Sequence, residues 1–229
     1  MADHTAHLIA DEPLAAGVRR LRLQLTTPFA SLLPGQYVGL HAPDGELVYF
    51  SVASIAADLP VLELHYAPMP GSPDVARMDA LLAATELRLT EPQGGTGLFS
   101  VPHAQSVVVI AAATGISQAI AILRGATHAK AATRIRLYWG VRGAPQLYAR
   151  ELLDGLAASL HDFEWTAVVS DDATWTGRTG LVVDAALADG AAKAADLVIL
   201  SGGPAMVQAS AARLIDAGVS LARVRSDLL

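Results

Sequence analysis

The chain contains no cysteine among its 229 residues. Disulfide bonds, thiolate zinc sites, cysteine nucleophiles and iron–sulfur clusters held by the chain's own thiolates are therefore excluded. This composition fits a cytoplasmic protein, which is the location we expect. Charge is also sparse, because 17% of the residues are charged and 52% are hydrophobic. Such a composition excludes intrinsic disorder and predicts a sizeable buried core.

Positive charge is in the minority. The 16 Lys and Arg residues face 22 Asp and Glu residues, which gives a net charge of −6. Proteins that bind nucleic acid in general need a basic surface to neutralise phosphates, so nucleic acid is not an expected partner. The first residues lack a basic segment followed by an apolar one, so no secretory signal is expected.

One uncharged run, residues 104–123, is long enough to imitate a membrane span. Its interior argues against that interpretation. Residues 107–110 are β-branched, Thr114 and Gly115 interrupt the run, and Ser117 opens an Ala/Ile/Leu segment. A buried strand, a tight turn and a helix explain this order better, and no membrane association is expected.

The pattern before residue 103 is one of short alternating segments separated by turn residues. Residues 7–10, 18–25 and 61–66 have the alternation of half-buried strands, and a helix is expected near 75–84. Regularly spaced short strands predict an antiparallel Greek-key β-barrel that is closed or nearly closed. We assign residues 1–103 to this domain.

Strands and helices alternate in residues 104–229. This rhythm predicts a doubly wound parallel sheet with helices on both faces, in which ligands lie beyond the carboxyl ends of the strands. The expected strands are 106–111, 134–139, 164–169 and 196–200, and the expected helices are 117–128, 147–160 and 203–216.

Several residues that could bind a ligand follow these strands. Thr114 and Gly115 join a strand to a helix whose free N–H groups would suit a phosphate. Gly202 and Gly203 would let a flat ligand approach the backbone. Both segments are also compatible with ordinary turns, because one glycine is not a dinucleotide-binding fingerprint.

The barrel half has its own candidate residues. Tyr49, Phe50, Ser51 and Ser54 combine aromatic rings, which stack on conjugated ligands, with hydroxyls that can bond a ring edge. Core packing is the alternative for the aromatic residues. Alternation places His65 away from the apolar face of its strand, where it would be exposed or hydrogen-bonded. Zinc-hydrolase and serine-hydrolase motifs are absent from the sequence.

Taken together, these motifs resemble the ferredoxin–NADP reductase superfamily over nearly the whole chain, and most closely the bacterial NAD(P)H:flavin oxidoreductases. Residues 50–54, Phe-Ser-Val-Ala-Ser, resemble the second part of the family's Arg-x-Tyr/Phe-Ser motif. Residues 201–206, Ser-Gly-Gly-Pro-Ala-Met, resemble its Cys-Gly-Pro-Pro-x-Met turn. Further similar segments are residues 35–38, 63–65, 91–95, 114–116, 138–142, 147–148 and 175–180.

The resemblance implies two bound nucleotides, a flavin (FAD or FMN) and NADH or NADPH, and no metal. Ser51 is the implied catalytic residue, with its hydroxyl directed at the flavin N5. The implied flavin-binding residues are Tyr49, Phe50, Ser51, Val52, Ala53, Ser54 and His65. The implied nicotinamide-nucleotide-binding residues are Thr114, Gly115, Ile116, Arg142, Ser170, Asp171, Gly202, Gly203, Pro204 and Met206.

The sequence departs from the family pattern at both nucleotide sites. Val48 stands where the family places an arginine that binds the flavin phosphate, and valine supplies none of that contact. Ala112 and Ala113 replace two glycines at the pyrophosphate turn. Ser201 replaces a cysteine, and Asp227 corresponds to an aspartate that an aromatic tail often follows.

Two functions follow from these matches and departures. The first is an oxidoreductase that transfers hydride from NAD(P)H to flavin and passes electrons to a partner such as an oxygenase, or releases reduced flavin. The second is a binding or regulatory subunit with weak or no flavin binding. For the enzyme we expect NADH to be preferred, because Asp171 and Asp172 would repel the 2′-phosphate of NADPH.

Overall fold

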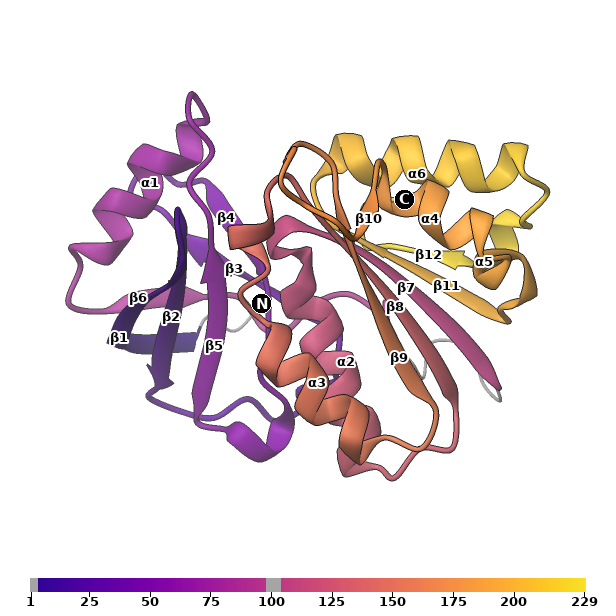
Figure 1. Ribbon diagram of the computed structural model, residues 1–229. Helices are drawn as coiled ribbons and strands as arrows, with labels where there is room; N and C mark the ends of the chain where they lie inside the picture. Colours follow the sequence, from indigo (N-terminus) through magenta and orange to yellow (C-terminus); the bar gives the residue numbers. More distant parts are fainter. Residues whose placement is uncertain (1–3, 98–103) are drawn as a thin grey trace.

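The computed structural model describes residues 4–97 and 104–229, which form two units side by side (Figure 1). One is a barrel of antiparallel strands. The other is a parallel sheet with helices on both faces, called the α/β unit below. The sequence-predicted border between residues 103 and 104 falls at the edge of a segment outside the described residues, so the domain limits remain a prediction.

Six antiparallel strands form the barrel, in the order β4-β3-β6-β1-β2-β5. An isolated antiparallel bridge between Val52, just after β4, and Leu64 of β5 joins the two edges. The predicted barrel is therefore confirmed. Its helix α1 (Pro73–Leu82) lies beside β4 (Figure 1). The strands are β1 (His4–Ala15), β2 (Val18–Leu25), β3 (Tyr37–His41), β4 (Leu47–Ser51), β5 (Val61–Tyr66) and β6 (Leu87–Leu89).

Alternating side chains build the barrel core. In β2 the side chains of Leu21, Leu23 and Leu25 are buried, whereas Arg19 and Arg22 are exposed. Strand period two explains this arrangement, because successive side chains point to opposite faces. The first strand is much longer than the predicted 7–10, since β1 pairs with both β2 and β6.

The α/β unit contains six parallel strands in the order β10-β9-β8-β7-β11-β12. The chain runs outward from β7 to β10 and then returns to the other side of β7. The topological switch therefore lies between β7 and β11, as in other doubly wound sheets. The strands are β7 (Ser106–Ala112), β8 (Arg134–Val141), β9 (Phe163–Val169), β10 (Arg178–Thr179), β11 (Leu197–Ser201) and β12 (Val224–Arg225).

Helices cover both faces of this sheet. The helices α2 (Ile116–His128) and α3 (Arg150–Ser159) lie between the sheet and the barrel (Figure 1). The opposite face carries α4 (Val182–Ala188), α5 (Ala191–Ala194) and α6 (Pro204–Asp216). Helix α3 begins three residues later than predicted, because a 3-10 turn over Ala144–Gln146 precedes it.

Strand β7 shows why residues 104–123 imitate a membrane span. Val107 and Val109 pack toward α2 and α3, whereas Val108 and Ile110 pack toward α4 and α6. A central parallel strand is buried on both faces and therefore reads as a continuous apolar run. Among the described residues, no helix is long and apolar enough to cross a membrane.

Candidate functional site

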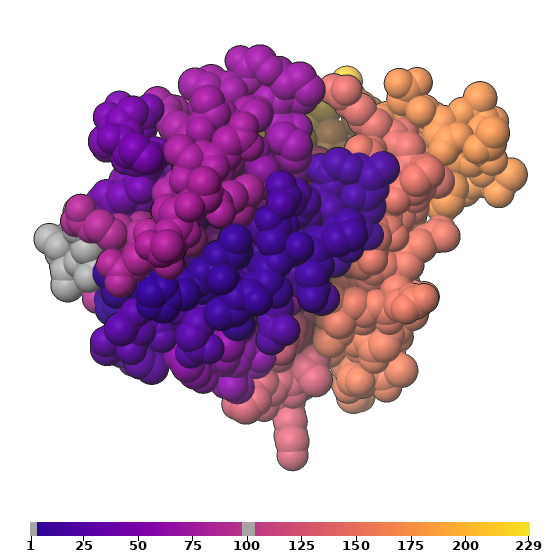
Figure 2. Space-filling model, turned by 90° about the vertical axis from the view of Figure 1, so that its left-hand side faces the viewer, coloured from indigo at the N-terminus to yellow at the C-terminus, as the bar shows by residue number. Residues whose placement is uncertain are grey.

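A cleft of about 680 Å³ lies between the barrel and the carboxyl edge of the parallel sheet. Its wall includes residues of β4, β5 and the start of α1 on the barrel side. The α/β unit contributes the turns after β7 and β11 and the C-terminal residues 226–228. Figure 2 shows a hollow where violet barrel atoms meet the salmon part of the α/β unit, with yellow C-terminal atoms in its depth.

The two turns at the topological switch lie against each other. A Cβ atom on Gly115 would come within 2.4 Å of the Ser201 carbonyl oxygen, so only glycine allows this backbone approach. The Ser201 hydroxyl donates a hydrogen bond of 2.9 Å to the Gly115 carbonyl. Thr114, Gly115, Gly202, Gly203 and Pro204 all line the cleft.

Ala113, just before Thr114, adopts a left-handed backbone conformation with φ of +49°. This conformation is unfavourable for a residue with a Cβ atom by about 1–2 kcal/mol. Its carbonyl accepts a hydrogen bond of 3.0 Å from the indole N–H of the fully buried Trp139. The alanine noted as a departure in the sequence is thus held in the geometry that a glycine would adopt freely.

The barrel side of the cleft is aromatic and carries a hydroxyl. Tyr49, Phe50 and Ser51 of β4 all line it. Phe50 meets Tyr66 edge to face with ring centroids 6.1 Å apart, and Tyr49, with 58% of its surface exposed, meets Tyr37 at 5.7 Å. No described residue hydrogen-bonds the Ser51 hydroxyl, which leaves it available to a ligand.

The next three residues of the motif lie outside the cleft lining. Val52 is buried in the barrel core, and Ala53 packs into the core formed by α2 and α3. The buried Ser54 hydroxyl accepts a hydrogen bond of 2.7 Å from the Glu63 backbone N–H. These residues position β4 and β5 relative to the α/β unit. Direct contact of their side chains with flavin remains a prediction.

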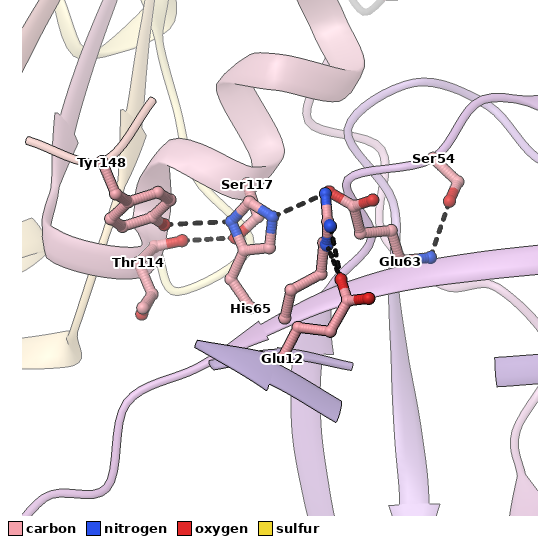
Figure 3. A network of polar contacts seen from close by, with 8 residues as sticks. Glu12, Ser54, Glu63, His65, Thr114, Ser117 and Tyr148 are labelled. Atoms are coloured by element: carbon pink, nitrogen blue, oxygen red, sulfur yellow. Dashed lines mark hydrogen bonds and ion pairs between the residues drawn. The ribbon is translucent and has the colours of Figure 1, made fainter. Parts of the chain in front are cut away.

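His65 lies in the cleft wall and joins the two units (Figure 3). Its Nε2 is 3.0 Å from Glu63 Oε1, and its Nδ1 is 2.9 Å from the Tyr148 hydroxyl. A carboxylate only accepts hydrogen bonds, so Nε2 carries a hydrogen, and in the neutral ring Nδ1 then accepts from Tyr148. The histidine is therefore buried and hydrogen-bonded.

Two pKa values around His65 are displaced. Burial, followed by the charge of Glu63, raises the pKa of the Tyr148 phenol well above its usual range. Burial alone would raise the pKa of the Glu63 carboxyl. The hydrogen bond from His65, with the electrostatic attraction of His65, Arg20 and Arg124, outweighs that effect and holds the Glu63 pKa below its usual range. Glu63 thus remains ionised and holds the imidazole.

The other predicted nucleotide-binding residues are not among those that line the cleft. Arg142, Ser170 and Asp171 follow β8 and β9, where the Asp171 backbone N–H donates a hydrogen bond of 2.8 Å to the Arg142 carbonyl. Ile116 is buried in the core under α2, and Met206 packs against the α4–α6 face. Their roles in nucleotide binding remain predictions.

The sequence analysis missed Asp74 and Gln118. The Gln118 side-chain amide donates to the Gly35 carbonyl at 2.7 Å and to Asp227 Oδ2 at 3.0 Å. Asp227 also accepts a hydrogen bond from the Thr96 hydroxyl at 2.9 Å. A polar residue in an otherwise apolar helix start was the available signal for Gln118. Asp74 gave only the signal of a helix N-terminus.

The cleft fits one part of a flavin better than the other. Aromatic side chains, the free Ser51 hydroxyl and the His65 ring suit a flat conjugated ring with polar edges. The phosphate-bearing part finds two carboxylates, Asp74 and Asp227, in the lining, and Val48 where a cation would be needed. Within the described residues, no cluster of His, Asp and Glu could hold a metal ion.

The geometry defines a two-unit protein with a cleft at the sheet edge where doubly wound folds bind nucleotides. Residues 109–212 match the family model described as an oxidoreductase NAD-binding domain. The chain is 30% identical over 189 residues to the NAD(P)H-flavin reductase of Aliivibrio fischeri, covering 78% of this chain and 77% of that protein. The chain belongs to the ferredoxin–NADP reductase-like family. A ferredoxin NADP+ reductase from Neisseria gonorrhoeae with the same fold, at 16% identity and a TM-score of 0.76, has FAD and NADP bound; it is covered over 96% of its length and 98% of this chain.

Other relatives serve oxygenase systems. The chain is 29% identical over 222 residues to the reductase component of the naphthalene 1,2-dioxygenase system of Pseudomonas putida, covering 96% of this chain and 67% of that protein. The crystal structure of an Amycolatopsis cytochrome P450 reductase superposes with a TM-score of 0.84 and 30% identity, covering 98% of this chain and 68% of that one. Two further relatives are covered over less of their length. The chain spans 64% of the reductase subunit of the Amycolatopsis aromatic O-demethylase and 58% of the reductase component of the Ralstonia naphthalene 1,2-dioxygenase/salicylate 5-hydroxylase systems.

Proposed function

We propose that this chain transfers hydride from NAD(P)H, with NADH preferred, to a flavin bound in the cleft. One observation carries the proposal. The turns after β7 and β11, which suit a nicotinamide nucleotide, and the free Ser51 hydroxyl of the barrel line the same cleft. In this arrangement the two units would hold the two reacting rings together.

The protein's contribution to this reaction is binding and positioning. The flavin, when bound, supplies the electron-accepting chemistry. The rings of Phe50 and Tyr66 pack edge to face and form an aromatic wall on one side of the ring site. The Ser51 hydroxyl is the hydrogen-bonding group for the ring edge, and Glu63 with Tyr148 fixes the orientation of the His65 imidazole. The turn before α2 and the positive end of that helix's dipole would face the nucleotide phosphates.

The fate of the electrons is a second part of the proposal. Relatives include a flavin reductase as well as reductase components of oxygenase systems. We infer that reduced flavin either leaves the cleft or delivers its electrons to an oxygenase partner in the cytoplasm. Weak phosphate recognition favours release, because Val48 and Asp74 would not hold the flavin tail.

The alternative function, a binding or regulatory subunit, is favoured by the departures at Val48 and Ala113. The two functions differ in turnover. Purified protein is mixed with NADH, with and without added riboflavin, FMN or FAD, and NADH oxidation is followed by absorbance under air. The enzyme hypothesis expects flavin-dependent NADH consumption. If flavin and NADH bind but no NADH is consumed, the regulatory function holds.

A further inference from the structure

The charge of the cleft bears on which flavin it accepts. All flavins share the ring and the ribityl chain, whereas FMN adds a phosphate with about two negative charges at neutral pH. Two carboxylates, those of Asp74 and Asp227, line the cleft, and its described lining contains no lysine or arginine. A flavin phosphate brought to the barrel side of this space, near Asp74, is therefore repelled, and a neutral tail is not.

The cation closest to Asp74 is already bound. The Arg77 guanidinium donates from Nη1 to Asp74 Oδ1 at 2.9 Å and from Nε to Asp44 Oδ2 at 2.8 Å. One positive charge is thus shared between two carboxylates. A phosphate would have to displace one of them to use Arg77, which reduces the gain from that contact.

The N-terminus of helix α1 also has partners within the protein and does not need a phosphate. Helix N-termini attract anions through free N–H groups and the helix dipole. Here the Ser72 hydroxyl caps the helix by accepting from the Asp74 backbone N–H at 3.2 Å, and the Asp74 carboxylate supplies negative charge in the first turn. The helix terminus therefore carries its own anion at the cleft wall.

Position 48 supplies no positive charge either, because the chain has valine where the family pattern has an arginine. The Val48 side chain is 5% exposed and packs in the barrel core, and its backbone pairs with Leu40 of β3. No adjustment of this residue brings a donor to the cleft. The ring end of the cleft, in contrast, has Phe50, Tyr66, Ser51 and His65 in place.

We propose that the cleft selects a flavin without a phosphate, riboflavin, over FMN, and that the carboxylate of Asp74 is a main cause. The inference rests on the proposed function and adds its substrate class. Riboflavin keeps the ring and the ribityl hydroxyls but brings no charge, so it gains the ring contacts without repulsion from Asp74 and Asp227. FAD differs from riboflavin in its adenine as well as in its phosphates, and the adenine can stack on aromatic side chains, so riboflavin and FMN are the pair that differ in the phosphate alone.

Fluorescence quenching titrations of the purified full chain with riboflavin and with FMN test this inference. At low ionic strength we expect riboflavin to bind about tenfold more tightly than FMN, equivalent to about 1.4 kcal/mol. The gap should narrow as salt is added, because salt screens the repulsion between charges and leaves ring stacking in place.

Substitutions identify the residues responsible. Asp74→Asn removes one carboxylate and frees one arm of Arg77, so FMN binding should tighten about threefold while riboflavin binding stays constant. Asp216→Asn, an exposed residue at the end of α6, removes the same charge far from the cleft and should leave the ratio unchanged. Val48→Arg should tighten FMN binding further. Circular dichroism shows whether Val48→Arg folds. If it does not, the Asp74→Asn variant and the salt dependence still test the preference for riboflavin over FMN.

The outcomes separate this inference from the proposed function. FMN binding as tightly as riboflavin to the unaltered chain, or an equal shift in both flavins with Asp74→Asn, overturns the selectivity and leaves hydride transfer to flavin intact. If neither flavin binds at high micromolar concentration, the proposed function fails together with the selectivity.

Discussion

The Tyr148 hydroxyl lies 2.9 Å from His65 Nδ1, across the boundary between the α/β unit and the barrel. The two rings meet edge to face at 5.4 Å. Tyr148 also meets Trp139 edge to face at 5.3 Å, and Trp139 donates to the Ala113 carbonyl. A continuous line of contacts therefore links the barrel strand at the cleft to the turn that would hold the nicotinamide nucleotide.

Tyr148→Phe removes the hydrogen bond across this boundary and leaves the ring in place. We expect the free energy of unfolding to fall by about 1–2 kcal/mol, because the buried imidazole loses its hydrogen-bond partner at Nδ1. Urea denaturation measures the change. Tyr49→Phe is the matched control, since that side chain is 58% exposed, and it should change stability by less than about 0.5 kcal/mol. Equal effects of the two substitutions would contradict the assignment.

Ala113→Gly relieves the left-handed backbone at the turn after β7. We expect the unfolding free energy to rise by about 0.5–1 kcal/mol, the strain of alanine at this φ less the greater entropy of glycine in the unfolded chain. Ala112→Gly serves as the control. Its φ of −127° suits alanine, so glycine there should lower stability by about 0.5–1 kcal/mol. A loss of stability in the Ala113 variant would show that the strain is absent.

Glu63 makes the protein sensitive to acid. Its folded-state pKa lies below that of the unfolded chain, so its stabilising effect is complete above the unfolded pKa of about 4.3 and is lost as pH falls through the folded value. In Glu63→Gln, the unfolding free energy should therefore fall less between about pH 6 and pH 3 than in the unaltered protein. The exposed Glu164 supplies the control Glu164→Gln, whose acid profile should match the parent.

The parallel sheet and the turns of the site could be predicted because local signals determine them. The β-branched run in 106–111 is buried on both faces, so it reads clearly as a central strand. Thr114, Gly115 and Gly202 follow strands in sequence, and the fold rule for parallel sheets then brings them to one edge. These residues do line the cleft.

The contacts between the units could not be predicted in the same way. His65 and Tyr148 are far apart in the chain, and neither has a neighbour in sequence that indicates the other. Asp74 looks like any acidic residue in the first turn of a helix, a position where carboxylates are favoured for helix stability alone. Its place in the cleft wall depends on how α1 sits beside β4, which no local pattern encodes.

Ser51→Ala tests the hydroxyl of the barrel wall. We expect single-turnover flavin reduction to slow about tenfold, the effect of one lost hydrogen bond to the reacting ring, with little change in NADH binding. Ser54→Ala is the control three residues away. Its hydroxyl accepts from the Glu63 backbone and lies outside the cleft lining, so this variant should lose stability rather than reduction rate. Unchanged reduction in Ser51→Ala would remove the residue from its predicted catalytic role.

The choice between NADH and NADPH should depend on Asp171. The Asp172 carboxylate accepts hydrogen bonds from Thr174 and from the Ala144 backbone, whereas no described residue binds the exposed Asp171 carboxylate. We expect kcat/KM for NADH to exceed that for NADPH at least about tenfold, and Asp171→Asn to narrow the ratio about threefold. Asp216→Asn again removes a distant charge and should leave the ratio constant. Steady-state kinetics with both nucleotides at one ionic strength measure this ratio, and equal kcat/KM values for NADH and NADPH would contradict the prediction.

Polar contacts from several segments of the α/β unit join it to the barrel. Gln118 of α2 binds the Gly35 carbonyl, Arg124 of the same helix pairs with Asp58 at 2.7 Å, and Tyr148 binds His65 away from that helix. Asp227, near the C-terminus, adds a hydrogen bond from Thr96, so contacts from α2, from Tyr148 and from the C-terminal segment all hold the two bodies in one relative position. This arrangement bears on how ligands enter and leave the cleft. Flavin and nucleotide must enter and leave through its open mouth, so exchange should be governed by diffusion and side-chain motion rather than by a hinge.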